Sequence, residues 1–285
     1  MHQLPYIIVC NKCQRDNLFY EYSDSAKCRW CGAPLSELLH REISLTNFLK
    51  LAGVESRAGN WKDADRYYTK ALEIDPDNVE AWLGRAIVAE HLAETTHDID
   101  FCRQSVAYIE RALEAGAHGY DCGYLFVHLA IPFAEAGDFE TAKSLVERGV
   151  QLEPPIDGHV ESNIWPRLGD IAASQRKYDL ARSLYERSDL DRVSIIDRLI
   201  CHMIDNADFA LVRQWVEPYI QACESDRGKS HAASMLLHLA RKAEWRAVKA
   251  MNPPECDAHI EANADALAKQ LRDRAKELDP TAEDL

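Results

Sequence analysis

An aromatic residue followed by small residues recurs along this chain, and the recurrence limits the possible folds more than any other feature. Phe48 and Trp82 begin two units that are 34 residues apart. Two further units begin at Phe126 and Trp165, after spacings of 44 and 39 residues. A period of this length is typical of arrays of antiparallel helix pairs, in which each repeat packs only on its neighbours. The sequence therefore predicts a mostly α-helical array over residues 43–195.

The first unit has the most complete pattern of small and large residues. Small side chains such as Ala52 and Ala64 let two helices approach closely, while large ones fill the space between repeats. The matching positions of this unit are Phe48, Leu51, Ala52, Gly59, Ala64, Tyr68, Ala71 and Pro76. The later units keep Ala86, then Leu129, Ala130, Gly137, Ala142 and Pro154, then Leu168, Gly169, Ala181 and Tyr185.

This pattern resembles the tetratricopeptide repeat, in about four copies. The resemblance implies a right-handed α-solenoid, in which the first helix of each repeat lines a concave groove. The two longer spacings imply extra residues. We expect them mostly between the two helices of the second unit, near Glu94–Asp100, and in the loop Pro154–Gly158.

Two Cys-x-x-Cys pairs near the N-terminus have the spacing of a site for one metal ion. The cysteines are Cys10, Cys13, Cys28 and Cys31. Gly32 follows the second pair, where a turn around a metal often needs a positive φ, and strand-like segments lie at 6–9 and 18–22. The motif resembles a zinc ribbon, in a module of residues 1–38. Four thiolates close the coordination sphere, so the metal is expected to be structural. We expect zinc, and the alternative is a rubredoxin-like iron site, which uses the same four ligands.

Two roles for this ribbon are open from the sequence. The metal holds together a module that is too small to build a core. Alternatively, its basic and aromatic side chains contact a partner protein or a single strand of nucleic acid. Those side chains are Lys12, Arg15, Lys27, Arg29 and Trp30. Acidic neighbours dilute the patch, and Trp30 has the alternative of packing on the first helix of the array.

Residues 196–285 are expected to form a degenerate repeat and capping helices. Helices at Val193–Met203 and Phe209–Ala222 would make the degenerate pair, followed by a helix at Lys229–Met251. A last helix at His259–Leu278 has one apolar stripe, which either caps the array or forms a dimer. The stripe consists of Ile260, Ala264, Leu267, Leu271, Ala275 and Leu278. A basic patch at 227–250 faces either nucleic acid or the acidic remainder of the protein.

Charge and cysteine content restrict the partners and the compartment. The formal net charge is −14, from 33 Lys and Arg against 47 Asp and Glu, so a nucleic acid is a poor default partner. No apolar run is long enough to span a bilayer, and the first residues do not resemble a secretory signal. Nine cysteines in a chain of this size favour a reducing, cytoplasmic compartment over a disulfide framework.

The tetratricopeptide resemblance also implies which residues face the groove. By position these are Leu49, Arg57, Glu80, Leu83, Ile87, His91, Tyr124, Val127, Ile131, Glu135, Asn163 and Asp170. The set is mixed apolar and acidic, which suits a basic or apolar segment of a partner protein. It lacks the Lys and Asn arrangement with which chaperone-binding members hold a C-terminal carboxylate, because Leu49, Gly53, Leu83 and Ile87 occupy those positions.

The sequence contains no phosphate-binding Gly-rich loop and no nucleophile elbow. Cys256 and His259 have no second pair with ligand spacing, so we expect them not to bind a metal. We therefore expect a non-catalytic adaptor or scaffold that binds protein. The alternative is a nucleic-acid-associated factor, with the ribbon and the 227–250 patch as its contact surfaces.

Overall fold

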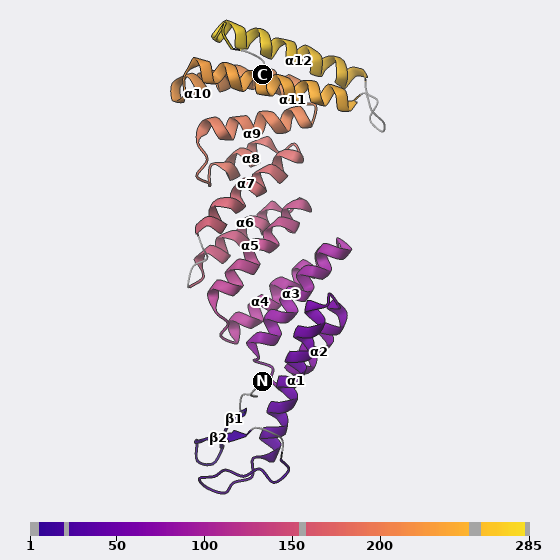
Figure 1. Cartoon of the computed structure of the whole chain (residues 1–285), viewed down its shortest axis with the longest axis vertical. Coiled ribbons are helices and arrows are strands. Elements are labelled where there is room, and N and C mark those ends of the chain that lie inside the picture. Colours follow the sequence, from indigo (N-terminus) through magenta and orange to yellow (C-terminus); the bar gives the residue numbers. More distant parts are fainter. Residues whose placement is uncertain (1–5, 20–22, 154–157, 251–257, 283–285) are drawn as a thin grey trace. The chain divides into compact units, whose positions relative to one another are not determined.

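The computed structural model describes residues 6–19, 23–153, 158–250 and 258–282. These residues form twelve helices and one two-stranded sheet (Figure 1). The chain divides into two compact units, Met1–Ile156 with the sheet and helices α1 to α6, and Asp157–Leu285 with α7 to α12. The predicted mostly α fold with a small N-terminal β module is confirmed. Among the described helices, none combines the length and apolar character needed to cross a bilayer.

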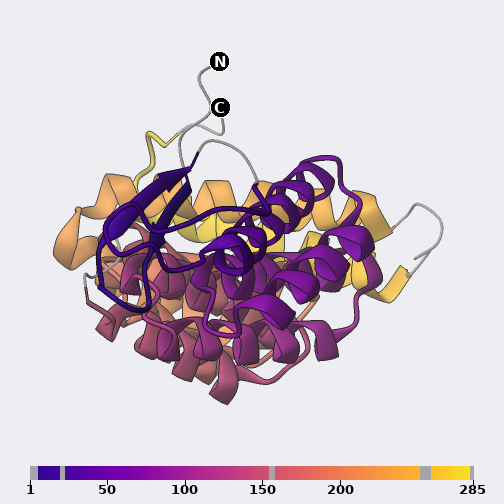
Figure 2. The ribbon, with the colours of Figure 1, turned by 90° about the horizontal axis from the view of Figure 1, so that it is seen from below.

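The N-terminal sheet shares its core with the first helix. Strands β1 (Tyr6–Val9) and β2 (Asp16–Phe19) pair antiparallel and lie beside α1 (Ser36–Arg57), as Figures 1 and 2 show. Because strand side chains alternate between faces, Ile8 points inward while its neighbours in the strand do not. Ile8 packs in one cluster with Leu39 of α1. The ribbon is therefore joined to the array by apolar contacts as well as by the chain.

The helices of the first unit pack as consecutive pairs. After α1 come α2 (Trp61–Ile74), α3 (Val79–Thr96), α4 (Ile99–Glu114), α5 (Gly119–Glu135) and α6 (Phe139–Gln151). The most extensive contacts join α1 to α2, α3 to α4 and α5 to α6. In α2 the buried residues Ala64, Tyr68 and Ala71 follow steps of four and three, which places them on one face of the helix.

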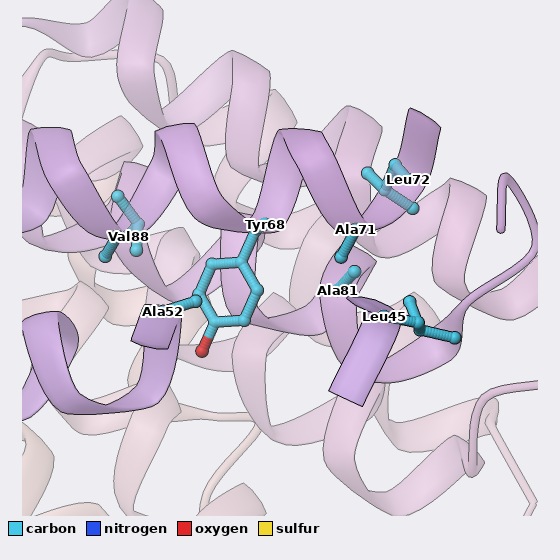
Figure 3. Packing of buried hydrophobic residues seen from close by; sticks show 8 residues of the cluster. Leu45, Ala52, Tyr68, Ala71, Leu72, Ala81 and Val88 are labelled. Atoms are coloured by element: carbon cyan, nitrogen blue, oxygen red, sulfur yellow. The ribbon is translucent and has the colours of Figure 1, made fainter. Parts of the chain in front are cut away.

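Small residues bring the first helices close together around the ring of Tyr68. Figure 3 shows this ring beside Ala52 of α1, with Ala71 of α2 and Ala81 of α3 next to each other. A Cβ atom placed on Gly84 of α3 would lie only 2.2 Å from the Tyr68 ring. The close approach of α2 and α3 therefore depends on a glycine as well as on the alanines at the expected positions.

The same type of turn follows several of the helices, although glycine occupies it in only some of them. After α1 the residue with positive φ is Gly59, at 76°, and after α9 it is Ala207, at 60°. In both turns this residue donates its N–H to the carbonyl three positions back, and the next residue donates to the carbonyl five positions back. Gly137 and Arg176 make the same pair of bonds after α5 and α7. This arrangement satisfies the last carbonyls of each helix.

The junction of α3 and α4 falls within the range Glu94–Asp100 in which extra residues were expected, but these residues do not form a long loop. Helix α3 continues to Thr96 and α4 begins at Ile99, so only two residues separate them. The side chain of Asp98 accepts a hydrogen bond from the N–H of Asp100 and starts α4 at once. The helical residues Glu94–Thr96 belong to the last turn of α3, so an insertion there lengthens a helix instead of a loop. Residues 154–157 of the other predicted insertion lie outside the described residues.

The described residues of the second unit form six helices. They are α7 (Gly158–Ser174), α8 (Tyr178–Tyr185), α9 (Arg192–Asp205), α10 (Phe209–Asp226), α11 (Lys229–Ala250) and α12 (Ala258–Leu278). The four helices predicted from Val193 onward are confirmed. The stripe of α12 is covered within the chain, because α12 packs on α11 and Leu267 and Leu271 are fully buried.

Candidate functional site: a four-cysteine cluster and an acidic groove

The four cysteines of the two Cys-x-x-Cys pairs come together as predicted. Their sulfur atoms all lie within 4.8 Å of one another. Cys10 Sγ is 3.6 Å from Cys31 Sγ, and Cys13 Sγ is 3.5 Å from Cys28 Sγ. These separations are far longer than a disulfide bond and close to the edge of about 3.8 Å of a tetrahedron with metal–sulfur bonds of about 2.3 Å. The donor set can therefore hold one tetrahedral metal ion.

The two cysteine turns have equivalent backbone hydrogen bonds. The N–H of Cys10 donates to Arg15, and the N–H of Cys28 donates to Ala33, in each case five residues ahead. The residue after the second cysteine of each pair has a left-handed backbone, with φ 56° at Gln14 and 72° at Gly32. The positive φ predicted for Gly32 is confirmed. Each turn thus presents its two thiols to the same point.

Asn17 joins the two cysteine turns and was missed by the sequence analysis. Its side chain is 2% exposed, and its Nδ2 donates to the carbonyl of Arg15 at 3.0 Å and lies 3.6 Å from Cys28 Sγ. Its Oδ1 accepts the N–H of Arg29 at 2.9 Å. Partners of this kind orient metal ligands and tune their basicity. No sequence signal pointed to Asn17, because the strand expected at 18–22 begins after it, whereas β2 runs from Asp16 to Phe19.

The surroundings of the sulfurs shift their thiol pKa values in opposite directions. Burial by itself raises the pKa of Cys28, but the backbone N–H groups of Trp30 and Cys31 outweigh it and lower the pKa to about 6. Burial raises the pKa of Cys13 to about 12. These surroundings favour the thiolate of Cys28, and a bound cation would favour loss of the protons from the other thiols.

A groove lies between α3 and α5 in the first unit. It has a volume of about 660 Å³ and is lined by apolar, acidic and histidine side chains. The lining residues are Leu83, Ile87, Glu90, His91, Glu94, Tyr120, Asp121, Tyr124, Leu125 and His128. Ile87, Tyr120 and Tyr124 are each about 40% exposed, so large apolar surface remains open to a ligand.

Negative charge in the groove comes from three carboxylates. Glu90 has a side chain only 17% exposed, and its desolvation raises its pKa. His91 stacks on Trp61, with 4.3 Å between ring centroids, and its Nδ1 lies 3.1 Å from Glu94 Oε2. Glu94 and Asp121 are exposed. The groove can therefore attract a positively charged ligand from solution.

The structure gathers four of the twelve predicted groove residues into this groove. They are Leu83, Ile87, His91 and Tyr124. Missed neighbours include Glu90 and His128, which lie three or four residues from Ile87 and Tyr124 and so share a helix face with them. The remaining predicted residues of the first unit lie elsewhere: Leu49 and Ile131 are half-buried, Arg57, Glu80 and Glu135 are exposed, and Val127 is buried at 2%.

The last two predicted groove residues lie in the second unit. Asn163 and Asp170 line a polar pocket of about 370 Å³ on α7. Asp170 is already engaged, since it accepts hydrogen bonds from Tyr185 at 2.7 Å and from Arg198 at 3.0 Å. Its pKa is lowered because hydrogen bonds from His202 and Tyr185 outweigh the effect of burial. Asp170 therefore stabilises the helix packing of this unit.

Acidic residues of the protein neutralise much of the basic patch at 227–250. Arg227 pairs with Asp191, and Lys242 Nζ lies 2.8 Å from Asp205 Oδ2. Arg246 is only 8% exposed and donates to the carbonyl of Asp205. These contacts match the prediction that the patch faces the acidic remainder of the chain, and they leave fewer cations for a nucleic acid.

The eight cysteines that the structure describes are all free thiols. Within the same residues, the N-terminal four are the only group of three or more side chains placed to hold a metal ion. Cys201 is largely buried, which raises its pKa to about 12. Cys256 lies outside the described residues, so its predicted lack of a metal role stays a prediction.

Comparison with known proteins gives one family match. Residues 46–88, which run from α1 through α2 into α3, match the model of the tetratricopeptide repeat. The resemblance predicted from Phe48 to Pro76 is therefore confirmed for this segment. No curated protein sequence matches the chain.

Two solved structures are similar to this chain at low sequence identity. One, described as the functional characterization of pilF of Pseudomonas aeruginosa, is 16% identical, with 85% of this chain and 95% of that chain covered and a TM-score of 0.37. The other, the APC/C hetero-tetramer Cut9–Hcn1, is 13% identical, with 84% of this chain and 44% of that chain covered and a TM-score of 0.40. At these TM-scores, neither likeness bears on what this chain binds.

Proposed function

Because residues 46–88 form a tetratricopeptide repeat, we propose that this chain is a non-catalytic adaptor that binds a basic, apolar segment of a partner protein in the groove between α3 and α5. The observation that supports the proposal is the composition of that groove. Its open apolar surface and its carboxylates lie together on two neighbouring helices. Repeat arrays of this kind bind extended or helical segments along such surfaces.

The apolar side chains of the groove would provide most of the affinity. Tyrosines are enriched among the residues that dominate binding energy, and Tyr120 and Tyr124 are both 41% exposed. Glu90, Glu94 and Asp121 would select Lys or Arg in the ligand and raise the association rate. The proposed ligand therefore combines large apolar side chains with positive charge.

The proposed metal of the four-cysteine cluster is zinc, in a structural role. Four thiolates leave no open coordination position, so such an ion stabilises the fold and does not activate water. Cys10→Ser and Cys28→Ser should each release the metal and loosen the ribbon while most of the helical circular dichroism remains. Elemental analysis of the purified protein distinguishes zinc from iron. A metal content unchanged in both variants would refute the assignment of the ligands.

The test of the adaptor function uses Tyr124→Ala, with Trp245→Ala as the matched control. Trp245 is an exposed aromatic residue of α11, in the other unit, at 60% exposure. Short peptides in which Lys or Arg alternate with Leu or Phe should bind the wild type and the control equally. Tyr124→Ala should weaken binding about 30-fold, the effect of a residue worth about 2 kcal/mol.

A second arm captures partners of the tagged full chain from its native extract, with and without nuclease. Partners that survive nuclease and are lost only in Tyr124→Ala would support the groove. Partners lost on nuclease treatment in every variant would instead support the nucleic-acid alternative. Equal peptide binding by Tyr124→Ala and the wild type would refute the proposed site.

A further inference from the structure

The ribbon has an exposed apolar face on the side of the hairpin that points away from its core. Ile7 is 60% exposed, Val9 48% and Leu18 49%. Ile7 and Leu18 are directly opposite in the strand register, and Val9 is two residues from Ile7, so the three side chains share one face of the sheet. The intervening Ile8 is buried in the ribbon core. Three aliphatic side chains therefore remain uncovered on a very small module.

Trp30 lies against the same hairpin. Its ring is 51% exposed, and its Nε1 donates to the carbonyl of Asp16, the first residue of β2, at 3.3 Å. The guanidinium carbons of Arg15 and Arg29 lie 4.9 and 4.6 Å from the centre of the ring. Contacts of this kind hold the two cations beside the indole. We use the name ribbon face for Ile7, Val9, Leu18, Trp30, Arg15 and Arg29.

The charge around the ribbon face is opposite to that of the chain as a whole. Lys12, Arg15, Lys27 and Arg29 are all exposed. Before α1 the sequence has these four cations against three carboxylates, whereas the chain has a net charge of −14. At physiological salt a charge is screened beyond about 8 Å, so a short ligand on this face responds mainly to the local cations.

We propose that the ribbon face is a second docking surface, which binds an acidic, apolar segment of a partner protein. The proposal rests on the adaptor function above and adds the chemistry of a second partner segment. The groove between α3 and α5 is apolar with carboxylates, and the ribbon face is apolar with guanidinium groups. One segment cannot match both surfaces, so the adaptor joins two segments of opposite charge.

A protein segment fits this surface better than a single strand of nucleic acid. Nucleic acids bind through phosphates and through the stacking of bases on aromatic rings, and aliphatic side chains add little to either contact. Ile7, Val9 and Leu18 gain free energy only when another apolar surface covers them. A long polyanion would also extend beyond the ribbon over the acidic remainder of the chain.

The test measures three probes by fluorescence anisotropy against the full-length, metal-loaded protein. The probes are a peptide in which Glu alternates with Leu or Phe, the same peptide with Lys in place of Glu, and single-stranded oligothymidylate. The wild type should bind the Glu peptide, more weakly as salt rises. The double variant Ile7→Thr, Leu18→Thr places threonine, which suits a β-strand, at both positions and should weaken that binding about tenfold. Arg15→Gln should also weaken it, whereas Arg192→Gln, an exposed arginine of α9, should not.

Metal content and circular dichroism of each variant show whether the ribbon is still folded. Tyr124→Ala should leave the Glu peptide unaffected and reduce only the Lys peptide, so failure of the groove and failure of the ribbon face are seen separately. The ribbon-face proposal is overturned if the Glu peptide does not bind, or if folded variants of the face bind it as the wild type does. It is also overturned if oligothymidylate binds more tightly than the Glu peptide and displaces it from the face.

Discussion

Gly84 of α3 lies against the ring of Tyr68, and the substitution Gly84→Ala tests this packing directly. A Cβ atom at this position would be 2.2 Å from the nearest ring carbon, where an ordinary contact begins at 3.4 Å. The ring or the helix must therefore shift by about 1.2 Å, the difference of those distances, in a region where Tyr68 is only 8% exposed. Overpacking of a core by a methyl group costs about 1–3 kcal/mol, and an overlap this deep belongs at the upper end. The higher helix propensity of alanine offsets about 1 kcal/mol, so we expect a net destabilisation of about 2 kcal/mol.

The matched control is Gly53→Ala, in the interior of α1. A Cβ atom there meets only the end of the Arg57 side chain, at 3.5 Å, which is an ordinary contact. The control should therefore gain only the higher helix propensity of alanine, which stabilises the folded protein by up to about 1 kcal/mol. Urea unfolding followed by circular dichroism measures both changes, and amide hydrogen exchange of α2 and α3 locates them. If Gly84→Ala is as stable as Gly53→Ala, Tyr68 does not pack on α3 as described and the reasoning is refuted.

Three further changes test the ribbon, a helix turn and a helix cap. Asn17→Ala removes a buried partner of the metal ligands and should lower metal affinity about 10–100-fold, measured in competition with a chelator. Asn11→Ala, at an exposed position, should leave the metal affinity unchanged. Equal affinities of the two variants would contradict this role of Asn17. Ala207→Gly should raise the free energy of unfolding by about 0.5–1 kcal/mol, because glycine adopts the φ of 60° without strain, and a lower urea midpoint would contradict it. Hydrogen bonds from Ser194 lower the pKa of Asp191 to about 2, so the stabilisation from its carboxylate is complete above about pH 4 and is lost as pH falls toward 2. Asp191→Asn should therefore lose less stability than the wild type over that interval, and parallel pH profiles would exclude the effect.

The local features of this protein could be predicted from the sequence. The spacing from Phe48 to Trp82 and the small residues between them specify a helix pair, because side-chain period and volume decide which faces can pack. The two Cys-x-x-Cys pairs specify a four-thiol cluster in the same way, since a tight turn needs only a few adjacent residues. The helices after Val193 were also found from periodicity, although the repeat pattern fades there.

The tertiary structure decided which distant residues meet. The groove joins Ile87 of α3 to Tyr124 of α5, whereas Val127, only three residues further on, is buried where α5 packs against Gly149 of α6. Asn17 became part of the cysteine cluster only when the two turns closed around it. Ala207 adopts a turn that uses glycine after α1 and α5, because the hydrogen bonds of the helix end outweigh its local preference. Contacts between elements depend on how each helix is rotated and shifted on its neighbour, and that information is spread over all the side chains of the interface instead of residing in one motif.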